Sequence, residues 1–205
     1  SMAEFGEDAV AGMAIVGRLT PVAFAIIFAL SGAIGPVIGQ NFGAGKQDRV
    51  KRAFREGLIF TGIVVVVVSG LLFAARPLLE MLFLLDGPAR TLVFLFAGPL
   101  SLLWFFNGMI FVSNAACNNM GHPFYSTVVN WGRHTIGTVP LVIFFSAWFG
   151  AGGVLIGQAV GGILFGLIAL VVAYRVMQTG GSGGTTGADG LDKQARTLGW
   201  LHRNR

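Results

Sequence analysis

The sequence predicts an all-α fold, a polytopic bundle of about five membrane-spanning helices, and three observations lead to it. The chain of 205 residues is 54% hydrophobic but only 11% charged, and its mean hydropathy is +0.74. Soluble domains are about 25% charged, so this chain lacks the residues for a polar surface. The charges also cluster and leave long uncharged segments. Finally, runs such as GIVVVVVSGLLF lack the alternation of apolar and polar residues that a membrane β-barrel strand needs.

The expected spans follow from four segments without Lys, Arg, Asp or Glu, namely 19–45, 57–75, 91–132 and 134–174. About 20 apolar residues cross a bilayer, so the last two segments are too long for one crossing each. They divide at NNMGHP (118–123) and at GAGG (150–153), because glycine and proline mark turns. The membrane domain, residues 1–177, is therefore expected to contain spans near 15–40, 57–76, 92–116, 126–148 and 153–174.

The basic residues predict an orientation. If five helices alternate, 11 of the 14 Lys and Arg residues fall on one side. Positive charge in short loops favours the cytoplasm, so we expect a multi-pass protein of the inner (plasma) membrane with its N-terminus outside. The C-terminal tail, 178–205, then lies in the cytoplasm and is expected to be flexible, because it contains TGGSGGTTGADG. The expected anchors at the inner lipid surface are Lys46, Arg49, Lys51, Arg52, Arg55 and Arg133.

Several classes of function do not fit. The segment GQNFGAGK is not a phosphate-binding loop, since Gln47 stands where that motif needs Ser or Thr. A nucleic-acid partner is not expected either, because the net charge of +5 is divided between segments that flank membrane spans. The three His residues and the single Cys117 show no metal-ligand spacing. We therefore expect neither an enzyme nor a metal site nor a bound cofactor.

The end of the first span, SGAIGPVIGQNFGAG, is rich in glycine. Ser31, Gly35 and Gly39 are spaced by four and form a face on which helices can pack closely. Pro36 removes a backbone donor and is expected to kink the helix. Kinked helices also form gates in transporters, so plain packing and a mobile gate both remain open. The residues of this conformational or packing motif are Gly35, Pro36, Gly39, Gln40, Asn41 and Gly43.

Polar side chains inside the spans are the candidate site residues. Asn107 and Asn114 lie on one stripe of the third span, where an unpaired amide is costly. Either they form interhelical hydrogen bonds, or they line a substrate cavity together with Trp104 and Phe111. Arg133 on the fourth span is a functional candidate by default, but its position near the inner end favours an anchor that reaches the headgroups.

Two sequence segments carry a resemblance to a known family. ALSGAIGPVIGQNFGAGKQDRVKRA, with its GQN-x-GA, resembles the end of a membrane helix in multidrug and toxic compound extrusion (MATE) transporters. NAACNNMGHP followed by NWGRHTIGTVPL resembles the junction between the tenth and eleventh helices of that family. The resemblance implies a fold of twelve helices in two six-helix lobes. It also implies export of organic cations in exchange for sodium ions or protons.

The resemblance places this chain at helices eight to twelve, about half of the lobe pair. Such a fragment would work with the missing N-terminal lobe or with a second copy. None of the nine acids lies inside an expected span, and LVFLFAGPLSLLWFFNGMIFVSNAAC has no acid where some family branches carry one on the tenth helix. The coupling-ion site is therefore expected outside this chain.

The resulting functional prediction is multidrug or organic-cation efflux by ion-coupled antiport, as part of a larger transporter. Two alternatives stay open. One is a non-transporting membrane assembly module or a small oligomeric channel. The other is a lipid-linked sugar exporter of the same superfamily.

Overall fold

The computed structural model describes residues 6–179, so the predicted tail lies outside the described range except for its first two residues. Helices joined by short turns make up this range, which confirms the all-α prediction. The labels η2 and η3 denote wider, π-helical turns. The elements in chain order are α1 (Glu7–Ala23), α2 (Ala25–Gly43), α3 (Gln47–Ala74), α4 (Arg76–Phe83), α5 (Gly87–Leu95), η2 (Phe96–Leu100), α6 (Trp104–Asn119), α7 (Pro123–Gly132), η3 (Arg133–Thr138) and α8 (Val139–Thr179).

Three helical segments are long and apolar enough to cross a membrane: Ala25–Gly43, Gln47–Ala74 and Pro123–Thr179. Gly87–Leu100 and Trp104–Asn119 meet the same criteria together, as a pair bent by 63°. The segment Pro123–Thr179 is 57 residues long, far more than one crossing needs. It contains a reversal, so its two arms count separately.

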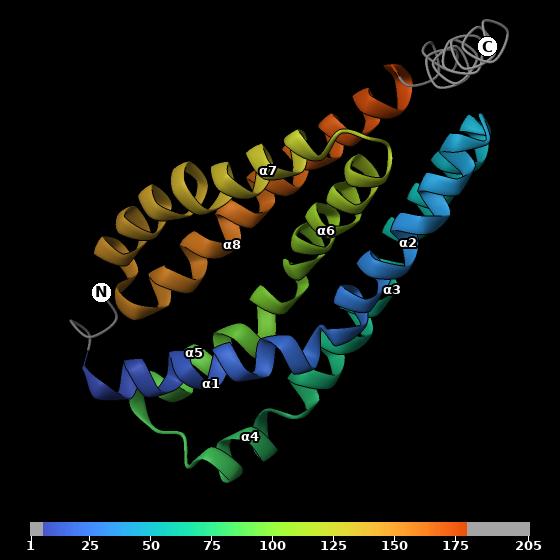
Figure 1. Ribbon diagram of the computed structural model, residues 1–205. Coiled ribbons are helices and arrows are strands. Elements are labelled where there is room, and N and C mark those ends of the chain that lie inside the picture. Colours follow the sequence, from blue (N-terminus) through green and yellow to red (C-terminus); the bar gives the residue numbers. More distant parts are fainter. Residues whose placement is uncertain (1–5, 180–205) are drawn as a thin grey trace, which may run out of the picture.

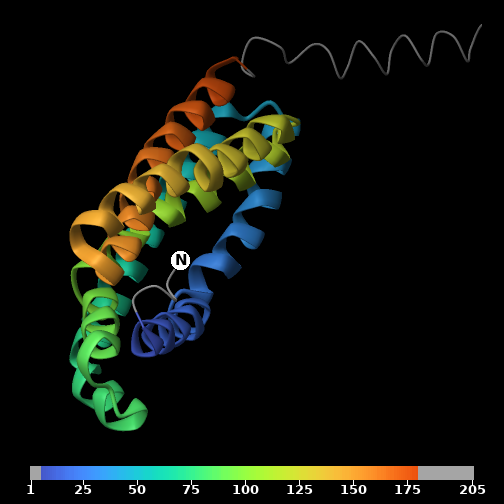
Figure 2. The same ribbon diagram turned by 90° about the vertical axis from the view of Figure 1, so that its left-hand side faces the viewer.

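The reversal is at Gly150, whose φ of 57° and ψ of −139° are outside the helical region and favour glycine. The two arms then pack against each other in antiparallel fashion, and the backbones come very close. A Cβ added to Gly157 would lie 2.7 Å from the Cα of Val142, and one on Gly161 would lie 2.8 Å from the carbonyl oxygen of Gly137. Small residues permit this approach between membrane helices. Both views show the arms side by side (Figures 1 and 2).

The helix α6 is the centre of the bundle. It packs against α2, α3, α7 and α8, whereas α1 packs mainly against α5 (Figure 1). The centre is lined by small and polar side chains of α6 that are fully or almost fully buried. These residues are Asn107, Gly108, Ser113, Ala115 and Ala116. Because α1 and α5 lie beyond the bend that precedes α6, the bundle is divided into two packed regions.

The bend lies at Gly98 and Pro99. Gly98 has non-helical angles, φ −128° and ψ −117°, and Pro99 has no amide hydrogen to donate. The Arg76 guanidinium donates to the Phe94 carbonyl oxygen on one side of the bend. The Ser101 hydroxyl donates to the Gly98 carbonyl oxygen at 2.6 Å on the other. Side-chain donors thus satisfy carbonyl groups at a place where the regular helical ladder is interrupted.

The predicted first span, 15–40, is interrupted in the structure. The chain breaks at Phe24, between α1 and α2, with φ −108° and ψ 19°. Pro21 lies in the last turn of α1, and the Phe24 ring is fully buried, so both local backbone and packing favour the break. Pro36, where a kink is expected, lies inside α2, which is one continuous helix from Ala25 to Gly43.

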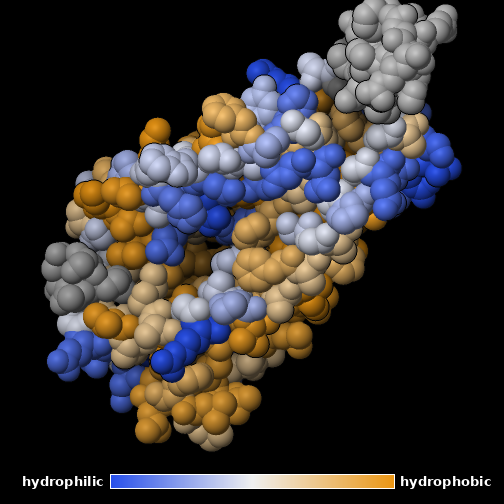
Figure 3. Space-filling view, viewed as in Figure 1, coloured by the Kyte–Doolittle hydropathy of each residue, from blue (hydrophilic) through white to orange (hydrophobic). Residues whose placement is uncertain are grey.

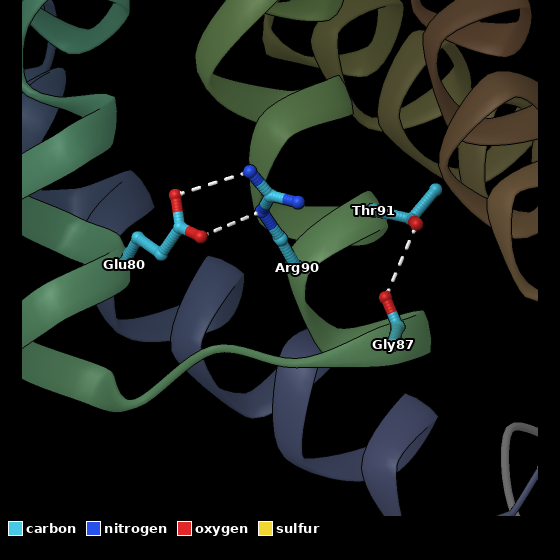
Figure 4. Close-up of polar contacts among 4 residues, drawn as sticks. All are labelled: Glu80, Gly87, Arg90 and Thr91. Atoms are coloured by element: carbon cyan, nitrogen blue, oxygen red, sulfur yellow. Dashed lines mark hydrogen bonds and ion pairs between the residues drawn. The ribbon is translucent and has the colours of Figure 1, made fainter.

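An ion pair fixes the connection before the bent pair. Figure 4 shows the Arg90 guanidinium, on α5, facing the Glu80 carboxylate, on α4, through the two nitrogen atoms along one of its edges. The Nε–Oε1 distance is 2.9 Å, and Nη2 donates to Oε2 at 3.3 Å. Thr91 donates to the Gly87 carbonyl oxygen at 3.2 Å and closes the first turn of α5. The two-point contact holds the short helix α4 beside the start of α5.

We predict that Gly157→Ala lowers the thermal stability of the complete protein in detergent. The new methyl group would meet the backbone of Val142, which cannot move without separating the two arms. Overpacking of this kind costs about 1–3 kcal/mol, so the midpoint of thermal unfolding should fall by several degrees. The matched control is Gly32→Ala on α2, where a Cβ meets nothing within 4 Å. Equal midpoints for the two variants would contradict the close packing of the arms.

Candidate functional site

A cavity of about 360 Å³ lies where α1, the bend between η2 and α6, η3 and α8 meet. This volume is within the range of about 300–1,000 Å³ that is typical of small-molecule sites. The space-filling view shows a hollow between α1 and the α7–α8 pair, with hydrophilic residues gathered along one side (Figure 3). Most of the wall is apolar. Its main polar side chains come from Thr20, Asn107, Arg133 and Gln158.

Two of the four predicted cavity residues, Trp104 and Asn107, line this cavity. The Trp104 ring stacks on Phe24, with centroids 4.5 Å apart and planes at 8°. Phe24 lies at the break between α1 and α2, and its ring orients Trp104. The break therefore supports the aromatic wall of the cavity. Asn107 is 6% exposed and comes from the first turn of α6 after the bend.

Polar side chains form a ladder between α6 and the α7–η3 segment. The Ser126 hydroxyl donates to the Asn114 carbonyl oxygen at 3.2 Å, and the Asn114 amide donates to Asn130 Oδ1 at 3.2 Å. The last rung is the Arg133 guanidinium, which donates to Asn107 Oδ1. The two segments run antiparallel, so Asn114 meets Asn130 and, one to two turns away, Asn107 meets Arg133. We refer to these contacts as the polar ladder.

Arg133, expected as an anchor at the inner lipid surface, has its side chain among the helices. The side chain lines the cavity and donates to Asn107 Oδ1. The physical reason is the spacing of Asn130 and Arg133, three residues apart and hence on one helical face. That face packs against α6, where Asn107 offers an acceptor. A charged group within a span takes such a partner in preference to hydrocarbon.

Asn114 and Phe111 do not line the cavity. Asn114 belongs to the polar ladder, so the interhelical hydrogen bond is the explanation that applies to this residue. The Phe111 ring packs edge-on against Phe28, with centroids 5.1 Å apart, and its carbonyl oxygen accepts from the Ser31 hydroxyl at 3.2 Å. Both residues therefore join helices and do not border the cavity.

The glycine-rich end of α2 packs and turns the chain. A Cβ on Gly35 would lie 2.4 Å from Nδ2 of Asn119, and one on Gly39 would lie 3.3 Å from Cβ of Asn119, so these two glycines pack against α6. Gln40 and Gly43 are exposed, as is Pro36, and Asn41 donates to the Val37 carbonyl oxygen at 2.8 Å. The turn itself is at Gly45, whose φ of 69° favours glycine.

The five basic residues after this turn, Lys46 to Arg55, are exposed at the start of α3. Arg52 pairs with Glu56 at 2.7 Å, a surface contact four residues apart on one helix. Lys51, Arg52 and Arg55 surround a shallow depression beside Tyr174 of α8. In the part of the chain that the structure describes, no group of three or more His, Cys, Asp or Glu side chains could hold a metal ion.

Comparison with known proteins gives the family. A family model described as MatE matches residues 1–144. The chain belongs to the MatE family. The probable multidrug resistance protein NorM of Pseudomonas aeruginosa is 32% identical over 181 residues, 85% of this chain and 37% of NorM. The FAD transporter of Shewanella oneidensis is 28% identical over 178 residues, 86% of this chain and 39% of that protein.

Solved structures show the same fold. The MATE transporter VcmN of Vibrio cholerae in its bent form superimposes with a TM-score of 0.81 at 19% identity. The match covers 87% of this chain and 41% of VcmN. The chain thus spans less than half the length of these MatE relatives. Transporters of this family are multi-pass proteins of the inner membrane.

Three cavity residues of this MatE chain carry only a weak sequence signal. The position of Arg133 near the end of a span favours the lipid surface, and Thr20 and Gln158 show no distinctive pattern. A usable pattern did exist: Asn107 and Asn114 are separated by seven residues, and Asn130 and Arg133 by three. Two antiparallel helices can match such stripes one to two turns apart, and this predicts facing polar pairs. The pattern does not show which of those pairs borders an open space.

We predict that Asn114→Ala and Asn130→Ala each destabilise the complete protein by about 0.6–2 kcal/mol, the usual range for interhelical hydrogen bonds in membranes. Because the two side chains share one bond, the double variant should lose little more than either single variant. Thermal unfolding in detergent measures all three. Asn118→Ala, at an exposed position of α6, is the matched control. Fully additive losses would show that the two amides do not interact.

Proposed function

We propose that this chain is the C-terminal-lobe portion of a transporter that exports small organic molecules by ion-coupled antiport. The observation that carries the proposal is the cavity at the bend of the α5–α6 pair, with Trp104 and Asn107 on its wall. Aromatic and amide groups in a largely apolar cavity suit drug-like molecules. The likeness to NorM, a probable multidrug resistance protein, supports the same function.

The proposal requires a second lobe. The chain spans 37% of NorM and 39% of the FAD transporter, so the missing N-terminal lobe or a second copy would complete the pathway. The coupling ion, sodium or a proton, would bind there also. Among the described residues the acids are Glu7, Asp8, Asp48, Glu56, Glu80 and Asp86. None of these lines the cavity.

Membership in the family leaves the substrate open, since the two relatives are named for different solutes. The sequence predicts organic cations as the substrate, and Trp104 and Asn107 suit a cation. Arg133 does not suit a cation, because its positive charge lies in the same cavity. Arg133 is therefore a better guide to the substrate class than membership in the family. Neither the assembly module, the small channel nor the lipid-linked sugar exporter gains support from a contact in the described residues.

We also propose the orientation with the N-terminus outside and the basic segment Lys46 to Arg55 in the cytoplasm. Five exposed cations in ten residues support it, because such loops are retained on the inner side. Arg133 no longer contributes to this argument. The opposite end of α3 leads to Asp86 and Arg90, where fewer basic residues are found.

The function is tested by efflux from cells that express the complete protein. We expect lower accumulation of at least one compound in a panel of cationic, zwitterionic and anionic dyes, and loss of that effect when residues 6–179 are deleted. Trp104→Ala should reduce efflux several-fold, whereas Trp104→Phe retains an aromatic wall. Trp148→Ala is the matched control, because Trp148 is 75% exposed and does not line the cavity. Efflux that survives the deletion would refute the proposal.

Orientation is tested by cysteine labelling in a Cys117→Ala background. A membrane-impermeant maleimide should label Asp86→Cys in intact spheroplasts but should label Lys51→Cys only after lysis. Both positions are exposed, so reactivity reports the side of the membrane and not burial. Labelling of Lys51→Cys in intact spheroplasts would reverse the proposed orientation.

A further inference from the structure

Arg133 brings a positive charge into the cavity, and the described residues supply no carboxylate to neutralise it. The ion pairs in residues 6–179 are Arg52–Glu56 and Arg90–Glu80, both at exposed positions. The partner of Arg133 is the neutral amide of Asn107. A charged group held inside a membrane domain without a counter-charge is costly, so its retention in a cavity suggests a ligand of opposite charge.

The geometry leaves most of the guanidinium available. Of its five N–H donors, one bonds to Asn107 Oδ1, and that is the hydrogen bond of this side chain with the described residues. No guanidinium nitrogen of Arg133 is among the buried atoms that lack a partner. The remaining donors therefore face open space, and Arg133 lines the cavity. A planar guanidinium with free N–H groups matches the paired oxygens of a carboxylate or phosphate.

The other lining residues of the cavity determine which chemical groups the rest of the ligand can carry. The Trp104 ring, oriented by its stack on Phe24, offers an aromatic wall, and Gln158 of α8 adds an amide. Met13 and Leu155 contribute apolar surface. A flat aromatic body carrying one anionic group would thus find a surface for each part.

We propose that Arg133, oriented by Asn107, is an anion subsite that binds the carboxylate or phosphate group of an aromatic organic solute. The proposal rests on the transport function proposed above and names its substrate class. It differs from the organic-cation expectation, because a cation would be repelled by Arg133. It also differs from a purely structural role, in which Arg133 only joins η3 to α6 and does not distinguish ligands by charge.

A matched pair of probes separates these roles. Dansylglycine carries a carboxylate, and dansylglycinamide is its neutral counterpart with nearly the same shape. Binding to the complete protein in nanodiscs of zwitterionic lipid is measured by energy transfer from tryptophan to the dansyl group. We expect dansylglycine to bind about ten-fold to hundred-fold more tightly, the range expected for a hydrogen bond to a charged group.

Three variants make the result specific. Arg133→Gln should remove the preference for the anionic probe and leave the affinity for the neutral probe unchanged, while Arg133→Lys should retain part of the preference through its charge. Arg18→Gln changes the same residue type at an exposed position of α1 that does not line the cavity, and it should behave as the unaltered protein. Unchanged affinity of Arg133→Gln for the neutral probe shows that this variant is folded.

Equal affinity for the two probes in the unaltered protein would overturn the proposal. So would an Arg133→Gln variant that weakens both probes equally, since that result is the mark of a structural role. A lipid headgroup is the other source of a phosphate. Displacement of dansylglycine when anionic phosphatidylglycerol is added to the nanodiscs, but not when the same concentration of inorganic phosphate is added, would assign the subsite to lipid and overturn the solute form.

The binding experiment and the efflux experiment fail separately. If efflux of dyes depends on residues 6–179 but the probes bind equally, the transport proposal stands and the anion subsite does not. If charge preference depends on Arg133 but no compound is exported, the subsite stands and the transport proposal does not.

Discussion

A proline inside a membrane helix removes one amide donor, and lipid offers no water to take its place. In this chain Pro99 and the non-helical Gly98 interrupt the helix between α5 and α6, and the segments Gly87–Leu100 and Trp104–Asn119 meet at an angle of 63°. The interruption persists because Arg76 and Ser101 supply donors to carbonyl oxygens on its two sides. The bend directs α5 toward α1 and α6 toward α8, and the cavity lies where these two regions diverge.

The walls of that cavity depend on contacts made elsewhere. Phe24, buried at the break between α1 and α2, orients the Trp104 ring by stacking on it. Asn107 follows Trp104 by about one turn of α6 and holds Arg133 from η3. The aromatic wall and the charged group therefore come from distant parts of the chain. Both are positioned by α6, which packs against α2, α3, α7 and α8.

Glycine serves different purposes in different parts of this molecule. Gly150 adopts the backbone angles that reverse the chain, and Gly157 allows the returning helix to approach Val142. Gly35 and Gly39 provide room for Asn119, so these two glycines of the motif take part in helix packing. The antiparallel arms place η3 beside α8, and this is how Gln158 and Arg133 come to border the same space.

The sequence by itself determined the fold class. Uncharged segments of about 20 residues or more that lack strand alternation can pair their backbone N–H and C=O groups in a bilayer only by forming helices. It also indicated the turn at Gly150 and the close-packing spacing of Gly35 and Gly39. It did not determine which faces of the helices meet. The position of Arg133 in the sequence favours the headgroups, and only the packing of α7 and η3 on α6 places Asn107 within its reach. Likewise Asn107 and Asn114 share a stripe, yet only the bend beside Trp104 leaves one of them next to open space. Hydropathy is a property of each segment, whereas a cavity arises where several helices pack together without filling the space between them.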